Sequence, residues 1–169
     1  MIRILTLVVS FVFLCTIASG QEIKKGGYYA NAANKKFKGT WVYIHEKDTF
    51  KVVLTESKKV YSEYIGIYSD FINGKYSYVK AGVRVADYMN DPQFLIVNCA
   101  AGTRDPATVK GYFVDRRKNK RGELRMQFLD EENKLLRWTL RNAKRERKGG
   151  LYADKSFSVP EDMILEKAD

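Results

Sequence analysis

The chain has 169 residues, and its first twenty have the character of an export signal, so a mature protein of 149 residues is expected. That length fits one compact domain, because domains of about 100 to 150 residues are the commonest. The formal net charge is +10 at pH 7, and it falls to +9 without Arg3 of the leader. One histidine and two cysteines exclude zinc sites built from His pairs or Cys clusters.

The leader, Met1 to Gly20, has the three parts of a secretory signal. Arg3 gives a positive start, Ile4–Ala18 form an apolar run, and Ala18-Ser19-Gly20 form a small-residue cleavage site. The run is shorter than the about 20 residues that a membrane-spanning helix needs. We therefore predict a signal peptide over residues 1–20, no transmembrane span, and a location in the periplasm or outside the cell.

The two cysteines bear on processing and on disulfide chemistry. A lipoprotein leader would use Cys15, but Leu14 stands before it in place of a small residue, so lipidation is disfavoured. Removal of the leader leaves Cys99 without an intramolecular disulfide partner. We interpret Cys99 as a small buried hydrophobic residue of an apolar strand rather than as a reactive thiol.

Along the mature chain, residues 21–36 lack an apolar period and contain Gly26-Gly27, so we predict a flexible N-terminal arm. Residues 37–169 are predicted to form a single β-barrel domain, because short segments rich in Val, Ile, Tyr, Phe and Thr alternate with turn-forming clusters. Asn73-Gly74 is predicted to be a hairpin turn. The expected strands cover residues 39–44, 49–56, 60–69, 76–85, 94–100, 109–115, 123–129, 135–141 and 163–165.

Alternating apolar residues in these segments define the fold class. Matched apolar faces are expected from Phe50, Val52 and Leu54, from Leu124, Met126 and Phe128, and from Leu136, Trp138 and Leu140. No segment has a helical apolar period of helical length, which favours antiparallel strands over parallel strands with helical crossovers. We predict an all-β, antiparallel up-and-down barrel of eight or nine strands, with a β-sandwich as the alternative.

Several motifs carry a resemblance to known families. Phe37-Lys38-Gly39-Thr40-Trp41 resembles the Gly-x-Trp start of the lipocalin and fatty-acid-binding superfamily. The order of this motif, Thr49–Leu54, Gly66-Ile67-Tyr68, Phe157–Pro160 and Met163–Lys167 is similar to a family of small uncharacterised exported proteins of Gram-negative bacteria. The resemblance spans most of the mature chain and implies a lipocalin-like, calycin-type barrel without an assigned activity.

The resemblance carries a structural role but no fatty-acid site. The eight residues between Trp41 and Phe50 leave no room for two lid helices, and the Arg-x-Tyr pattern that holds a carboxylate is missing. In lipocalin-like barrels a cation covers the first-strand Trp. The resemblance therefore implies that Trp41 closes the barrel under Lys167 or Arg141.

Catalytic and cofactor chemistry find no support in the sequence. His45 lies in the charged turn His45-Glu46-Lys47-Asp48, which is typical of a solvated loop. The adjacent carboxylates Asp130, Glu131 and Glu132 do not face one another across a cleft, as acid-base hydrolysis requires. Gly149-Gly150 lacks the spacing of a phosphate-binding loop. We predict no catalytic residue, no metal and no cofactor.

The positive charge is concentrated in one third of the chain. Residues 116–148 contain thirteen Lys or Arg and five Asp or Glu. Successive turns of an up-and-down sheet alternate between its ends, so the two basic clusters should share one end with Lys58 and Lys59, with the acidic turn opposite. The candidate anion-binding residues are Arg116, Arg117, Lys118, Lys120, Arg121, Lys144, Arg145, Arg147 and Lys148.

The sequence leaves two classes of function open. The first is a non-enzymatic exported binding module, whose basic end would contact an anionic surface such as lipid phosphate, lipopolysaccharide or acidic glycan, or whose interior would hold a small apolar ligand. The second is a hydrolase-type enzyme with a concealed site. Export disfavours nucleic acid as a partner, and the basic loops also fit a solvated surface kept for solubility. A barrel interior filled by Phe50, Val52, Leu54, Met126, Phe128, Trp138 and Leu140 would indicate a packed core.

Overall fold

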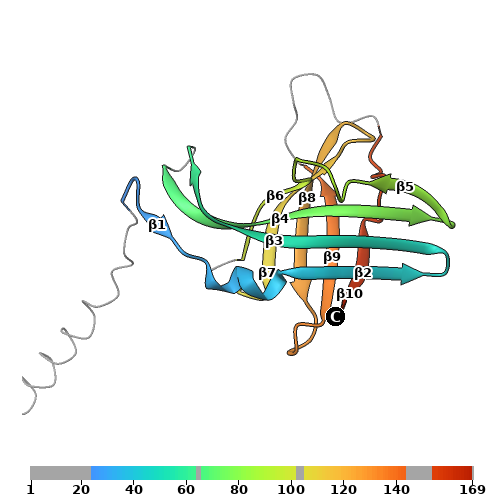
Figure 1. Ribbon diagram of the computed structural model, residues 1–169, viewed down its shortest axis with the longest axis horizontal. Helices are drawn as coiled ribbons and strands as arrows, with labels where there is room; N and C mark the ends of the chain where they lie inside the picture. The colour runs from blue at the N-terminus through green and yellow to red at the C-terminus, as the bar shows by residue number, and fades with distance from the viewer. Residues whose placement is uncertain (1–23, 64–65, 102–104, 144–153, 169) are drawn as a thin grey trace, which may run out of the picture.

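The computed structural model describes residues 24–63, 66–101, 105–143 and 154–168, for residues 96–101 the backbone alone. The chain forms one curled sheet and a short 3-10 helix (Figure 1). In chain order the elements are β1 (Tyr28–Tyr29), η1 (Ala32–Phe37), β2 (Gly39–His45), β3 (Asp48–Ser62), β4 (Ile67–Lys80), β5 (Val83–Asp87), β6 (Ile96–Ala101), β7 (Thr108–Asp115), β8 (Lys120–Phe128), β9 (Leu135–Asn142) and β10 (Asp162–Ala168).

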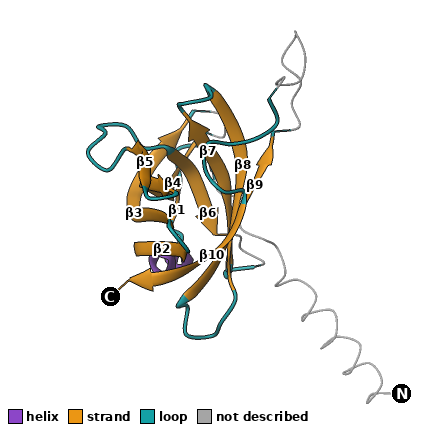
Figure 2. Cartoon of the chain, turned by 90° about the vertical axis from the view of Figure 1, so that its right-hand side faces the viewer, coloured by secondary structure: helices purple, strands orange, loops and turns teal. Residues whose placement is uncertain are grey.

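Eight strands make the barrel wall. Neighbours in the chain pair antiparallel from β2 to β4 and from β6 to β10, β10 pairs with β2, and β6 also pairs with β4. The strands β2–β4 cross β7–β10 at a steep angle (Figure 1), and the sheet curls around the core (Figure 2). The predicted all-β up-and-down barrel is confirmed, with one difference: β1 pairs with β4 in parallel, so the sheet is mixed.

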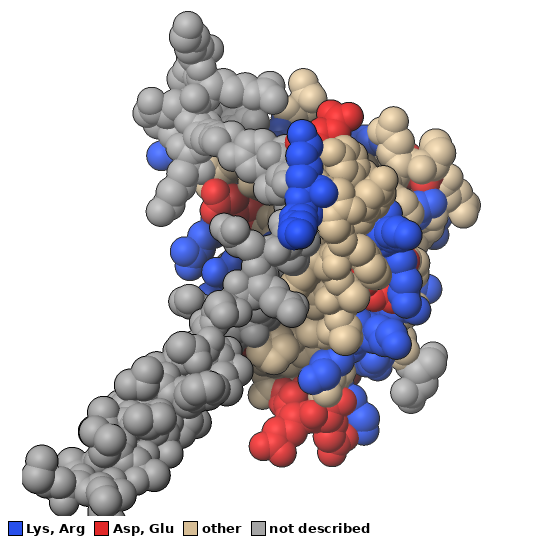
Figure 3. All heavy atoms as spheres, turned by 90° about the vertical axis from the view of Figure 1, so that its left-hand side faces the viewer, with Lys and Arg blue, Asp and Glu red and all other residues tan. Residues whose placement is uncertain are grey.

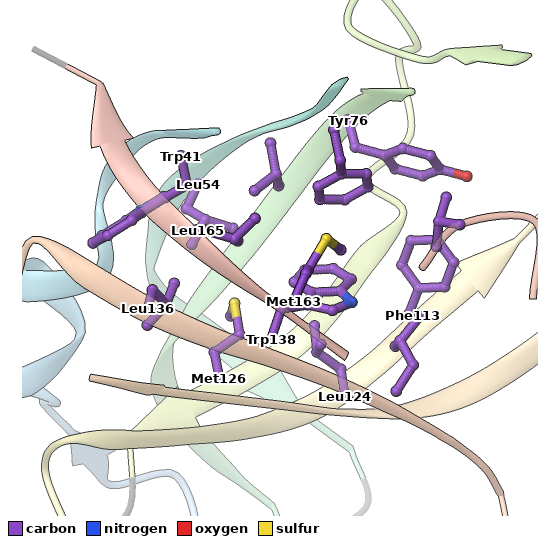
Figure 4. Close-up of a cluster of buried hydrophobic side chains, with 14 of the residues drawn as sticks. Trp41, Leu54, Tyr76, Phe113, Leu124, Met126, Leu136, Trp138, Met163 and Leu165 are labelled. Atoms are coloured by element: carbon purple, nitrogen blue, oxygen red, sulfur yellow. The ribbon is translucent and has the colours of Figure 1, made fainter. Parts of the chain in front are cut away.

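The alternating residues decide which side of each strand faces inward. The inward-facing apolar residues of β3, β8 and β9 are buried, whereas most intervening positions are exposed or half-buried. Val60 and Tyr61 at the end of β3 and Leu135 at the start of β9 are exposed. Large side chains from opposite walls meet in the interior, as the close-up of the core shows (Figure 4). The buried members of the expected faces are Phe50, Val52, Leu54, Leu124, Met126, Phe128, Leu136, Trp138 and Leu140.

The prediction for residues 49–85 was wrong in three places. The expected strand 76–85 is divided by a turn at Ala81-Gly82, so that residues 76–80 end β4 and residues 83–85 begin β5. Residues 49–56 and 60–62 belong to one long strand with a bulge between Ser57 and Val60, where Lys59 has a φ of 53°. Asn73-Gly74 lies inside β4, paired with Thr55 and Leu54. The Asn73 side chain donates a hydrogen bond of 2.6 Å to Ser57 Oγ, so long-range strand pairing overrides the local turn preference of Asn-Gly.

The arm expected at residues 21–36 is attached to the barrel over its described part, from Lys24 onward. Tyr28 pairs with Tyr68 of β4, and η1 follows directly. Asp70, 4% exposed, organises this segment. Its carboxylate accepts hydrogen bonds from Tyr28 Oη at 2.7 Å, Asn31 N at 3.2 Å and Lys59 N at 2.9 Å. A local sequence pattern does not reveal donors gathered from such distant positions.

Acid should release this arm from the barrel. Burial pushes the pKa of Asp70 upward, but the hydrogen bonds from Tyr28, Lys59 and Asn31 outweigh burial and leave the pKa below its ordinary value. The carboxylate therefore stabilises the fold above the unfolded-state pKa of about 3.9, and this stabilisation is lost as the pH falls through the lower folded-state pKa. We expect the protection factors of the amides of residues 28–31, taken relative to the intrinsic exchange rate at each pH, to fall below pH 4. The Asp70→Asn variant should lack this acid step, and an identical pH profile in that variant would contradict the assignment.

Candidate anion-binding site

The barrel interior is a packed core over the described residues. Phe50 lies 5.3 Å from Trp138, Trp138 5.7 Å from Phe113, and Phe113 5.1 Å from Tyr76, measured between ring centroids. Seven residues were expected to fill the interior if it is a packed core, and each has at most 7% of its surface exposed: Phe50, Val52, Leu54, Met126, Phe128, Trp138 and Leu140. Buried aromatic and aliphatic side chains from different strands point toward one another in this interior (Figure 4).

Trp41 belongs to this core at the end of the barrel near η1. Its side chain is fully buried, and its Nε1 donates a hydrogen bond of 2.8 Å to the carbonyl of Phe37. Lys167 Nζ lies over the ring, 5.4 Å from its centroid. Of the two cations considered for this contact, the structure places Lys167 on Trp41, while Arg141 lies on the outer face of β9. These contacts agree with the predicted role of Trp41 in closing the barrel, which the Trp41→Ala variant tests.

Three cations of the β7–β8 turn are tied to the protein itself. Arg116 forms an ion pair of 2.7 Å with Asp91. Arg117 donates a hydrogen bond to the carbonyl of Val85. Lys118 forms an ion pair of 2.6 Å with Asp154. Because each already has an internal partner, these side chains fasten neighbouring segments to this end of the barrel and are less available to an external anion.

The next two cations point to opposite sides of β8. Lys120 is 4% exposed, lies 4.0 Å from the ring centroid of Phe157, and donates a hydrogen bond of 3.0 Å to Asn142 Oδ1. Burial lowers the pKa of its ammonium group. Arg121 points outward, where its guanidinium lies 5.2 Å from the ring centroid of Tyr112. Arg121 is therefore the member of this cluster that is placed to meet a ligand.

The second basic cluster, Lys144, Arg145, Arg147 and Lys148, lies outside the described residues. The strand before it ends at the same end of the barrel as the β7–β8 turn, since Asn142 pairs with Gly122. The acidic turn Asp130–Glu132 lies at the other end, at the bottom of the face in Figure 3. Lys58 and Lys59 do not join the basic end, because they form the β3 bulge and not a connection between strands.

A groove of about 690 Å³ lies on the outer face of β7–β10, outside the packed core. Its walls are formed mainly by the residues that alternate with the buried positions of these strands. Their side chains are therefore directed to solvent, on the side of the sheet away from the core. The lining residues are Lys110, Gly111, Tyr112, Glu123, Leu124, Arg125, Gln127, Arg137, Thr139, Arg141 and Asp162.

The groove carries four cations and two carboxylates. Arg137 is paired with Asp162 through two hydrogen bonds of 3.0 and 2.7 Å. Lys110, Arg125 and Arg141 form no ion pair with a carboxylate of the described chain. These three cations therefore have no neutralising carboxylate in the described chain, and Arg125 donates one hydrogen bond, of 3.0 Å, to Gln127 Oε1.

Sequence reasoning assigned the basic charge to turns and missed this face. The signal was present in the strand period: Arg121 and Arg125 alternate with Leu124 and Met126, and the same holds for the cations of β9. A strand whose apolar face points inward must direct these cations outward. Of the predicted residues, Arg121 and Arg141 reach this face.

Other kinds of site receive no support from the described part of the chain. No group of three His, Cys, Asp or Glu side chains there is arranged to hold a metal ion. Within the same residues, no helix has the length and apolar character needed to cross a membrane.

The fold and the groove define a class: an all-β barrel with a packed interior and a charged outer face. The family described as "Family of unknown function (DUF6705)" matches residues 1–168, so the chain belongs to that family. No curated protein and no solved structure matches the chain significantly.

Proposed function

We propose that this protein is an exported, non-enzymatic binding module that holds anionic ligands on its outer surface. The observation that carries the proposal is the groove on β7–β10, where Lys110, Arg125 and Arg141 face solvent without a carboxylate partner in the described chain. The signal-like leader supports export to the periplasm or beyond. The Gly-Thr-Trp start and the cation over Trp41 support a lipocalin-like, calycin-type barrel.

The packed interior favours this proposal over an interior apolar ligand. A ligand inside the barrel would have to displace side chains such as Phe50 and Trp138, which are already in contact. Displacing such rings from a close-packed core is costly. The outer groove needs no such rearrangement, because it is open in the folded protein.

Salt dependence provides the test of this function. The mature protein should bind an anionic polymer or vesicles containing phosphatidylglycerol at low ionic strength, and neutral polymers or zwitterionic vesicles much more weakly. Because exposed charges are screened beyond about 8 Å at 0.15 M salt, binding should weaken steeply between 0.02 and about 0.3 M NaCl. Equilibrium binding to each probe at several salt concentrations measures this. Absence of binding to every anionic probe at low salt would contradict the proposed function.

A further inference from the structure

We propose that the outer groove of β7–β10 binds a linear polysaccharide that carries carboxylates, a polyuronate. This inference rests on the proposed function and names the class of anion and the residues that hold it. Four features of the groove support it: its shape, its donor groups, the spacing of its charges and the carboxylates among them.

The shape of the groove favours a chain over a membrane surface. A concave volume of about 690 Å³ falls within the range of about 300 to 1,000 Å³ that small-ligand sites occupy. A flat bilayer would touch only the rim of such a groove, whereas a single polymer chain can enter it. The aliphatic residue in the lining, Leu124, is 2% exposed, so it offers little surface for insertion into lipid.

The donor groups suit carboxylates and sugar hydroxyls. The planar guanidinium groups of Arg125 and Arg141 match a carboxylate through paired hydrogen bonds. Thr139 lines the same groove and can hydrogen-bond a hydroxyl, and Gln127, whose Oε1 accepts a hydrogen bond of 3.0 Å from Arg125, still has its amide N–H groups as donors. Tyr112, 42% exposed, has Arg121 over its ring and still presents aromatic surface that can pack on a sugar.

The cations are spaced along and across the strands. Lys110 and Arg125 are directly opposite in the β7–β8 pair, and Arg141 is opposite Glu123, two residues from Arg125. The Cβ atoms of directly opposite residues lie about 5 Å apart, and diagonal neighbours lie about 7 to 8 Å apart. Three cations that start this close together on one face can contact charges on successive units of a polymer.

Carboxylates in the groove favour binding of a polyuronate over binding of a polyphosphate. Glu123 lies between Tyr112 and Arg141 in the strand register, and Asp162 occupies the groove beside Arg137. These carboxylates repel any polyanion, and they repel a backbone with denser charge, such as duplex nucleic acid, more strongly than a chain with one charge per sugar. They can accept hydrogen bonds from sugar hydroxyls, so a chain with one charge and several hydroxyls per unit is favoured.

A charge-matched pair of variants tests this proposal. Arg125→Gln with Arg141→Gln removes two groove cations, and Lys47→Gln with Lys51→Gln removes two exposed cations of the β2–β3 hairpin. Both changes lower the net charge equally. Binding to polygalacturonate should fall more than about tenfold in the groove variant, because hydrogen bonds between charged groups are lost. The hairpin variant should remain within about twofold of the unchanged protein, and both should keep the same melting temperature.

Binding to three further probes, measured in the same way, shows which class of ligand the groove prefers. Dextran should not bind, and duplex DNA and phosphatidylglycerol vesicles should bind more weakly than polygalacturonate. Equal loss in both variants would overturn the groove as the site. Binding to vesicles or DNA without binding to polygalacturonate would overturn the polyuronate assignment and leave the proposed anion binding intact. Failure of all anionic probes at low salt would overturn both.

Discussion

The Trp41→Ala variant is expected to lose about 3 to 5 kcal/mol of unfolding free energy, the usual cost of removing a large aromatic side chain from a core. Trp41 is fully buried, its ring lies 5.9 Å from that of Phe128, and its Nε1 bonds to the carbonyl of Phe37. The substitution leaves a cavity, removes the hydrogen-bond donor to the Phe37 carbonyl, and removes the ring over which Lys167 lies. Many domains have a total stability of only about 5 to 15 kcal/mol, so much of the variant should unfold near physiological temperature.

Thermal and urea unfolding measure this loss, with Tyr112→Ala as the matched control. Tyr112 is an aromatic residue on the outer face of the sheet, and its truncation should cost less than about 1 kcal/mol. An unchanged melting temperature for Trp41→Ala would show that this residue does not close the barrel.

Asp115→Ala should have the second-largest effect on stability, at about 2 to 4 kcal/mol, because three half-buried donor groups would lose their buried acceptor. Asp115 is fully buried at the end of β7. It accepts hydrogen bonds from Ser158 N at 2.6 Å, Ser158 Oγ at 2.8 Å and Lys118 N at 3.2 Å. Its carboxylate thus attaches the segment before β10 to the β7–β8 turn.

Asp130→Ala provides the comparison for burial. Asp130 also accepts backbone hydrogen bonds, from Leu135 N at 2.8 Å and Lys134 N at 3.0 Å, but at an exposed turn. Water can replace its carboxylate there, so its loss should cost about 1 kcal/mol or less. Equal destabilisation of the two variants, measured by urea unfolding, would show that burial of Asp115 does not set the cost.

The barrel was predictable because each strand shows, within a few residues, the alternation of apolar and polar side chains that is typical of a half-buried strand. Phe50 and Val52, or Trp138 and Leu140, alternate with polar neighbours, and this period determines which face of each strand is buried. The lengths of the strands were harder to predict. The bulge at Lys59 and the pairing of Asn73 inside β4 depend on contacts between strands, and at Asn73-Gly74 these contacts outweigh the local preference for a turn.

The candidate site was predictable only in part, because a sequence shows charge but not the partners of that charge. Arg116 and Lys118 belong to the most basic stretch, yet Asp91 and Asp154, distant in the sequence, engage them. Arg125 was not singled out from the sequence and Arg141 was considered only as a cation over Trp41, whereas the strand register places both on one outer face. A basic cluster in a turn is therefore weaker support for a binding site than cations repeated on one face of adjacent strands.

The most direct measurement of the central claim is an amide chemical-shift titration of the mature protein with polygalacturonate oligomers. Binding in the groove predicts the largest shifts at Lys110, Arg125 and Arg141 and at their neighbours on β7–β9, with little change in the Trp138 indole of the packed interior. Shifts centred on the β2–β3 hairpin, or a large shift of the Trp138 indole with none in the groove, would contradict binding on the outer face.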